Sequence, residues 1–314
     1  MHSPNPYIQS PQEEALSQVV ESLCCPASYH SVVHKTKHDM PMPSVEALGE
    51  FVKILRAIFF PGYFGHLELT PMSMRYYVGS YLDHAFRILS EQIKRGFCFI
   101  CQTNEEDQCQ RCTKKALELA SDFLSRLPKI RHLLSTDVQA AYEGDPAAKD
   151  PGETIFCYPS IQALIHQRVA HELYTMDIPL IPRIITEMAH SNTGIDIHPG
   201  AKIGEKMFID HGTGVVVGET CIIGRNVRIY QGVTLGAKSF AVDDKGNPIK
   251  GIPRHPIVED DVIIYSGATV LGRITLGKGS VVGGNVWVTK DLPPGSRVLQ
   301  SRPQQEQFDQ GSGI

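Results

Sequence analysis

The spacing of apolar residues divides the chain near residue 190. Upstream of this point, apolar positions recur at the three- and four-residue intervals of amphipathic helices. Ser44 is placed to cap one helix, whose apolar stripe is Val45, Leu48, Phe51, Leu55, Ile58 and Phe59 and which Pro61-Gly62 ends. We expect further helices near 72–95, 113–127, 129–143, 159–175 and 180–191. Residues 1–190 are therefore predicted to form a mainly α-helical N-terminal domain.

From residue 194 the apolar positions instead recur every six residues. The series is Ile197, Ile203, Ile209, Val217, Ile223, Ile229, Leu235, Val258, Ile264, Val270, Leu276, Val282 and Val288. A helix needs a period near 3.6 and a half-buried strand a period of 2, so neither explains this spacing. A period of six fits a β-solenoid in which each hexad forms one side of a triangular coil. The apolar residue then points inward, and the small residues beside it allow tight corners.

Two interruptions of the series lie beside charged residues. The step from Ile209 to Val217 is longer than a hexad, so extra residues bulge out at "DHGTG", which contains Asp210 and His211. The polar, Gly- and Pro-bearing stretch 237–254 separates Leu235 from Val258. Insertions in a solenoid are extruded on one face, often the binding face. These interruptions are therefore the first places to look for chemistry.

The overall composition changes this prediction little. The chain has 314 residues, a formal net charge of -4 and a pI near 6.3, and these values do not indicate nucleic-acid binding or an anionic membrane surface. No apolar run is long enough to span a membrane, and the first residues lack a secretory signal pattern. We expect a cytoplasmic protein, whose eight cysteines are then thiols or metal ligands rather than disulfides.

Four of these cysteines form a regular array. Cys98, Cys101, Cys109 and Cys112 have the spacing C-x2-C-x7-C-x2-C. Each C-x2-C pair offers two thiolates at one turn, and four thiolates make a tetrahedral metal site. The pattern predicts a structural Zn, but an iron–sulfur cluster or four reduced thiols on a helical hairpin also fit.

The motifs "DIHPGAKIG", "DHGTGVVVGE", "VTLGA" and "PRHP" resemble the catalytic core of serine O-acetyltransferases, which belong to the hexapeptide-repeat acyltransferase superfamily. The resemblance covers roughly residues 135–295 and includes "DPAAKDP", which begins at Asp145. It implies an α+β fold, with an N-terminal α-helical domain at 1–190, a left-handed parallel β-helix at 191–295 and a flexible tail at 296–314. It also implies trimers or dimers of trimers with active sites between subunits, and transfer of acetyl from acetyl-CoA to L-serine in cysteine biosynthesis.

The resemblance also assigns roles to individual residues. His211 would be the general base, oriented by Asp196, while Asp145 and Asp210 would hold the substrate amino group. Arg254 and His255 would hold its carboxylate. The residues near acetyl-CoA would be Gly236, Ala237, Ser266 and Gly267. At the place of a lysine often used near the CoA phosphates this chain has Ser280, with Lys278 nearby. The terminal Ile314 would enter the active site of O-acetylserine sulfhydrylase.

These assignments agree with elementary chemistry. A neutral imidazole can accept the serine hydroxyl proton near pH 7, and a carboxylate on its other nitrogen stabilises the imidazolium. A zwitterionic acceptor needs carboxylates at one end and a guanidinium at the other. Two other functions remain open: acetyl transfer to a sugar or another small alcohol, and a carbonic-anhydrase-like zinc site built from His198, His211 and His255.

Overall fold

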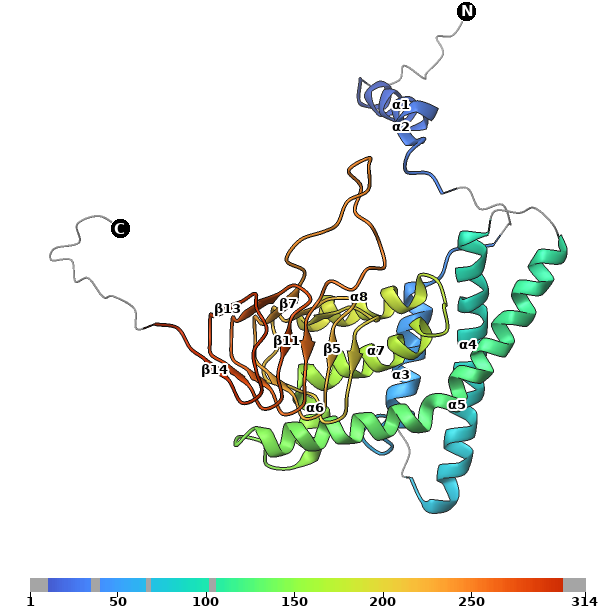
Figure 1. Ribbon diagram of the computed structural model, residues 1–314. Coiled ribbons are helices and arrows are strands. Elements are labelled where there is room, and N and C mark those ends of the chain that lie inside the picture. Colours follow the sequence, from blue (N-terminus) through green and yellow to red (C-terminus); the bar gives the residue numbers. More distant parts are fainter. Residues whose placement is uncertain (1–10, 35–39, 66–68, 102–105, 302–314) are drawn as a thin grey trace, which may run out of the picture.

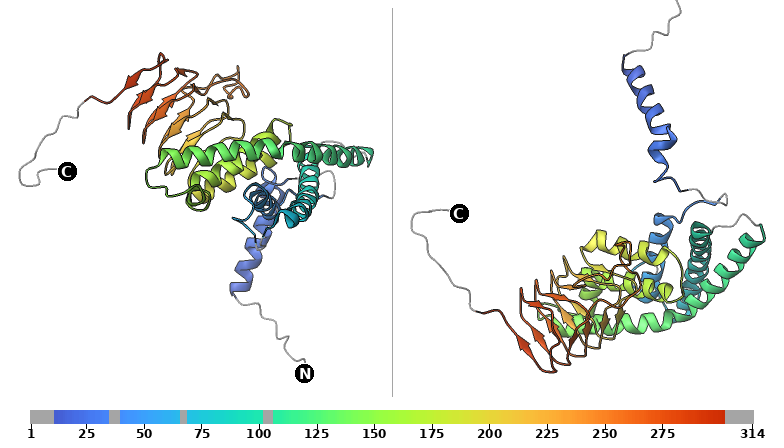
Figure 2. Two further views of the ribbon diagram at one scale, coloured as in Figure 1. Left: turned by 90° about the horizontal axis from the view of Figure 1, so that it is seen from below. Right: turned by 45° about the horizontal axis from the view of Figure 1, so that its top comes forward.

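The computed structural model describes residues 11–34, 40–65, 69–101 and 106–301, with the side chains of Pro11 and residues 106–109 left out. An α-helical part is followed by three-sided coils of short strands (Figures 1 and 2). The helices are α1 (Pro11–Cys24), α2 (Pro26–Tyr29), α3 (Val45–Phe59), α4 (Pro71–Ile100), α5 (Glu106–Gly144), α6 (Pro151–Cys157), α7 (Pro159–Tyr174) and α8 (Ile181–Thr193).

Helix α3 confirms the capped helix that the sequence predicts. The Ser44 side chain accepts a hydrogen bond from the Ala47 backbone N–H at 3.1 Å, and the last helical residue is Phe59. The apolar stripe is buried from Leu48 to Phe59, while Val45 at its beginning is exposed. Packing against the helices around it therefore adds to the local capping signal.

Helix α5 corrects the prediction of two helices at 113–127 and 129–143. One continuous helix runs through Pro128, which lacks the N–H that would donate to the carbonyl four residues earlier. Phe123, Leu127, Ile130 and Leu134 on both sides of the proline are buried in the core. Burial of this continuous apolar face outweighs the missing hydrogen bond, so the proline does not end the helix.

The coils confirm the β-helix. Its strands are β1 (Asp196–Ile197), β2 (Lys202–Ile203), β3 (Phe208–Ile209), β4 (Val216–Val217), β5 (Ile222–Ile223), β6 (Arg228–Ile229), β7 (Thr234–Gly236), β8 (Ile257–Val258), β9 (Ile263–Ile264), β10 (Thr269–Leu271), β11 (Thr275–Leu276), β12 (Val281–Val282), β13 (Trp287–Val288) and β14 (Arg297–Val298). Every third strand pairs in parallel, which gives sheets ordered β1-β4-β7-β10-β13, β2-β5-β8-β11 and β3-β6-β9-β12-β14. Three strands thus complete one turn of a left-handed coil.

The hexad positions form the core of this coil. Each of the apolar residues from Ile197 to Val288 lies in its own strand, and all but the half-buried Ile203 are buried. Strand β14 continues the last sheet beyond residue 295, where the sequence predicts a tail. The proposed domain boundaries at residues 190 and 295 remain predictions, although α8 ends at Thr193 and β1 begins at Asp196.

Both interruptions leave the coil as expected. At the first interruption, His211 has φ 56° and Gly212 has φ 91°. A Cβ added at residue 212 would lie 2.5 Å from Cδ1 of Ile195. This bulge therefore requires glycine at residue 212. The second, residues 237–254, projects from the coils as the orange loop of Figure 1, between β7 and β8.

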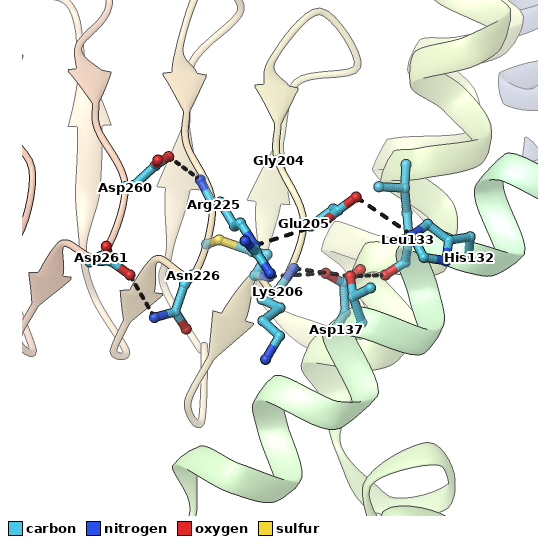
Figure 3. A network of polar contacts seen from close by, with 12 residues as sticks. His132, Leu133, Asp137, Gly204, Glu205, Lys206, Arg225, Asn226, Asp260 and Asp261 are labelled. Atoms are coloured by element: carbon cyan, nitrogen blue, oxygen red, sulfur yellow. Dashed lines mark hydrogen bonds and ion pairs between the residues drawn. The ribbon is translucent and has the colours of Figure 1, made fainter.

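A buried ion pair joins the helical part to the first coil. Arg168 of α7 donates two hydrogen bonds to the Asp137 carboxylate of α5, at 2.7 and 2.8 Å, and both side chains are almost fully buried. The same guanidinium donates to the backbone carbonyls of Ile203 and Gly204, and Asp137 accepts from the Met207 N–H. Figure 3 shows Asp137 facing this turn of the coil. The pair therefore fixes α5 relative to the β-helix.

The same edge of the coil continues as a ladder of polar contacts (Figure 3). Glu205 pairs with Arg225 at 3.7 Å, and the Asn226 amide donates to Asp261 at 2.8 Å.

In the described parts of the chain, no helix is long and apolar enough to cross a membrane.

Candidate active site

The sequence-predicted site residues lie at two corners of the first coils. Strands β1, β4, β7 and β10 pair in parallel, so their amino ends lie along one edge of the sheet and their carboxyl ends along the other. The segment Asp210–Gly214 precedes β4, and we call this edge the amino corner. His198 and Glu219 follow β1 and β4, and we call that edge the carboxyl corner.

The amino corner holds the candidate base. The His211 side chain is 73% exposed, and its Nε2 lies 4.0 Å from Oδ1 of Asp210. Asp145 follows α5, and hydrogen bonds from the Tyr158 hydroxyl and the Ala147 N–H lower the pKa of its carboxyl. The neighbouring His211 makes a smaller contribution in the same direction. Two carboxylates and an accessible imidazole therefore meet at this corner.

Asp196 has a different neighbour from the one expected. Its Oδ1 lies 3.8 Å from Nη1 of Arg183 on α8, and in the described part of the chain no hydrogen bond or ion pair joins it to His211. Asp196 is the first residue of β1 and so lies at the amino end of its sheet. Its proposed role in orienting His211 stays a prediction.

The carboxyl corner holds the candidate cationic group. The Arg254 guanidinium lies 2.8 Å from Oε2 of Glu219, and the Tyr174 hydroxyl donates to the same carboxylate at 3.1 Å. Burial disfavours ionisation of Glu219, but the hydrogen bonds from Arg254 and Tyr174 outweigh it and lower the pKa of this carboxyl. Arg254 also lines a cavity of about 360 Å³ with Phe240 and Ile249 of the projecting loop. A substrate carboxylate would compete with Glu219 for this guanidinium.

His255 is held as a neutral ring beside Arg254. Burial, with the positive charge of Arg254, lowers its pKa to about 4. Its Nδ1 accepts from the Thr220 backbone N–H at 3.1 Å, so the single proton of the neutral ring lies on Nε2. Thr220 Oγ1 accepts from the backbone N–H groups of Arg254 and His255 and anchors the end of the loop. Nε2–H is thus a fixed donor.

We predict that Gly218→Ala displaces this donor. A Cβ at residue 218 would lie 2.0 Å from Cδ2 and 2.2 Å from Nε2 of His255, and the ring cannot stay where Thr220 holds it. A misplacement of this size should lower kcat/KM for the acceptor by about 10–100-fold. Gly79→Ala is the control, because nothing lies within 4 Å of that Cβ on helix α4. Equal activity of both variants would show that His255 does not contact the acceptor.

The four residues expected near acetyl-CoA divide between the corners. Gly236 and Ala237 lie at and after the carboxyl end of β7, whereas Ser266 and Gly267 precede β10 and belong to the amino corner. Ser280 is fully buried and donates to the Gly277 carbonyl, so it does not take the place of the lysine that the resemblance implies near the CoA phosphates. Lys278 is exposed and lies 3.6 Å from Asp261.

The metal predictions have different outcomes. Within one chain His211 lies at the amino corner and His198 and His255 at the carboxyl corner, so the chain does not gather them into a zinc site. Among the described residues, the only group of ligand atoms within 4.8 Å is Glu187, His190 and Asp196. Arg183 lies 2.5 Å from Glu187 and already pairs with this group. These contacts are explained by ion pairing.

The cysteine array lies at the carboxyl end of α4 and in the first turns of α5. Cys98 and Cys112 are buried and Cys101 is half-buried. The side chain of Cys109 and residue Ile314 lie outside the described residues. The metal at the array and the docking of Ile314 to a sulfhydrylase therefore stay predictions, which metal analysis and a binding assay with the truncated chain would test.

Three residues of these corners were not predicted from the sequence. Tyr158 stands in "CYPSI" before α7, while Gly218 and Glu219 stand in "VVVGE" after β4. The available signal for Glu219 was its place at the end of the motif "DHGTGVVVGE". The sequence carried no signal that Tyr158 would reach Asp145, because the two are joined only by tertiary structure.

Comparison with known proteins gives one family. No model of a protein family matches the sequence. A plasmid serine acetyltransferase of Synechococcus elongatus is 51% identical over 276 residues, which are 87% of this chain and 86% of that protein.

Solved structures agree with this similarity. A crystal structure of serine acetyltransferase isoform 3 from Entamoeba histolytica, in complex with cysteine, is 33% identical with a TM-score of 0.70 and covers 94% of this chain and 96% of that one. A soybean serine acetyltransferase complexed with serine is 29% identical with a TM-score of 0.53 and covers 83% and 98%. The extent of the sequence match and the shared helical and β-helical parts lead to one conclusion: the chain belongs to the serine acetyltransferase family.

Proposed function

We propose that this serine O-acetyltransferase moves the acetyl group of acetyl-CoA directly to the hydroxyl of L-serine, with His211 as the general base, as a step of cysteine biosynthesis. The observation that carries the proposal is the division of charge between the corners. The amino corner offers Asp145 and Asp210 beside His211, and the carboxyl corner offers Arg254 and the Nε2–H of His255. Together they match the ammonium and carboxylate groups of a zwitterionic acceptor.

The proposed reaction needs a single base. His211 would take the proton from the serine hydroxyl while the oxygen attacks the acetyl carbonyl. The new C–O bond forms, the C–S bond breaks, and the imidazolium returns the proton to the departing CoA thiolate. A backbone N–H at the Gly236-Ala237 turn would stabilise the oxyanion, a contribution of about 3 kcal/mol.

The two corners are proposed to meet between subunits. One side of the coil is a hexad, so the corners of one chain are separated by up to about 20 Å of extended backbone. L-serine is far too short to bridge them. In a trimer the amino corner of one subunit can face the carboxyl corner of its neighbour, and the same pairing would bring Ser266 and Gly267 opposite Gly236 and Ala237.

Acceptor profiling tests this function. With acetyl-CoA as donor, CoA release should be fastest with L-serine and low with sugars and simple alcohols, which have no carboxylate for Arg254. Arg254→Ala should lower kcat/KM for L-serine by about 10²-fold, since it removes a charge-assisted bidentate contact. Preferential acetylation of a neutral sugar would contradict the proposal and favour the alternative function, acetyl transfer to a sugar or another small alcohol.

A further inference from the structure

Tyr158 links the helical part to the amino corner through Asp145. It is the last residue before α7 and is half-buried against the core, with Pro159 following it. Its hydroxyl donates to Oδ2 of Asp145, while Oδ1 of the same carboxylate accepts from the Ala147 N–H at 2.8 Å. Each carboxylate oxygen thus has one fixed donor and keeps a lone pair for another.

The charges around this phenol make it a neutral donor. Burial and the neighbouring Asp145 raise the pKa of Tyr158, with smaller contributions from Glu153 and Asp210. The hydrogen bond in turn lowers the pKa of Asp145, so the carboxylate stays ionised. A lysine or arginine in this place would also hold Asp145 but would neutralise it, as Arg254 does for Glu219 at the other corner. The phenol orients the carboxylate and leaves its negative charge available.

We propose that Tyr158 is a positioning residue for Asp145 and makes the acceptor site selective for molecules that carry an ammonium group. The inference rests on the proposed function, because it assumes that Asp145 contacts the substrate amino group. An oriented and ionised carboxylate favours a cation at a fixed place. The binding free energy gained from a neutral hydroxyl in that place is much smaller.

Tyr158→Phe tests the proposal through the KM for L-serine. We expect this KM to rise about tenfold, because Asp145 loses a hydrogen bond to a charged group, while the KM for acetyl-CoA stays near its wild-type value. L-glycerate serves as a competing inhibitor, since it keeps the hydroxymethyl and carboxylate groups of L-serine but has a hydroxyl instead of the ammonium. Its inhibition constant should change little.

Tyr77→Phe is the matched control. The Tyr77 hydroxyl donates to the backbone carbonyls of Phe64 at 3.2 Å and Ala57 at 3.4 Å in the helical part, so the control also removes the hydrogen bonding of a buried phenol. A loss of affinity for L-serine and L-glycerate by the same factor, or no change in either, would overturn the role of Tyr158. Asp145→Asn tests the contact of Asp145 with the substrate separately from the role of Tyr158. An unchanged KM for L-serine in that variant would show that Asp145 does not contact the substrate, and the inference would then fail as well. Absence of any serine acetylation by the wild type would instead refute the proposed function.

Discussion

Replacement of His211 by alanine is expected to lower kcat about 10²–10⁴-fold, the usual contribution of a general base. The side chain is 73% exposed and lies at a bulge of the coil, so its removal should leave the packed interior intact. CoA release at saturating L-serine measures kcat. His132→Ala is the control, because that histidine is also exposed and lies on α5 beside Glu205.

Near-normal turnover of His211→Ala would contradict the mechanism. A fall in both variants would point to damaged folding, which sedimentation and the thermal transition would show.

His211→Ala also tests whether the active site lies between subunits. His211→Ala is defective at the amino corner, and the double variant Arg254→Ala/His255→Ala is defective at the carboxyl corner. When equal amounts assemble at random into trimers, about one quarter of the sites should combine an intact amino corner with an intact carboxyl corner. Activity should therefore rise to about one quarter of the wild-type value. Mixed trimers no more active than their parents would place both corners in one chain's site.

Replacement of Arg168 by methionine is expected to destabilise the protein by about 3–5 kcal/mol, because Asp137 would keep a buried charge without its partner. The carbonyls of Ile203 and Gly204 would also lose their donor. For a chain of this size the melting temperature should fall by roughly 10 °C. Calorimetry or circular dichroism with increasing temperature measures this shift.

A second variant separates charge from packing. Asp137→Asn/Arg168→Met removes the uncompensated charge but keeps an acceptor for the Met207 N–H, so it should recover part of the lost stability. Arg87→Met is the exposed control, since its partner Asp83 is also exposed and such pairs contribute little. A melting temperature of Arg168→Met close to that of Arg87→Met would show that the buried pair does not hold the helical part on the coil.

The repeat of apolar residues predicts most of the β-helix. Each of the hexad residues from Ile197 to Val288 falls in its own strand, because a period of six is a local property that repeats in every coil. The bulge at His211 and the loop at 237–254 are also visible as breaks in that period. Helix α3 follows from its cap and its apolar stripe.

The sequence by itself determined the coil, its interruptions and the kinds of charged groups beside them, because these depend on neighbours along the chain. Only the tertiary structure decided that α5 continues through Pro128, that Arg168 meets Asp137, and that Tyr158 meets Asp145. It also decided that His211 and Arg254 lie at different corners, because the loop 237–254 interrupts the hexad register between them. The helix contacts depend on how helices pack on the coil, and no periodicity or motif specifies that packing.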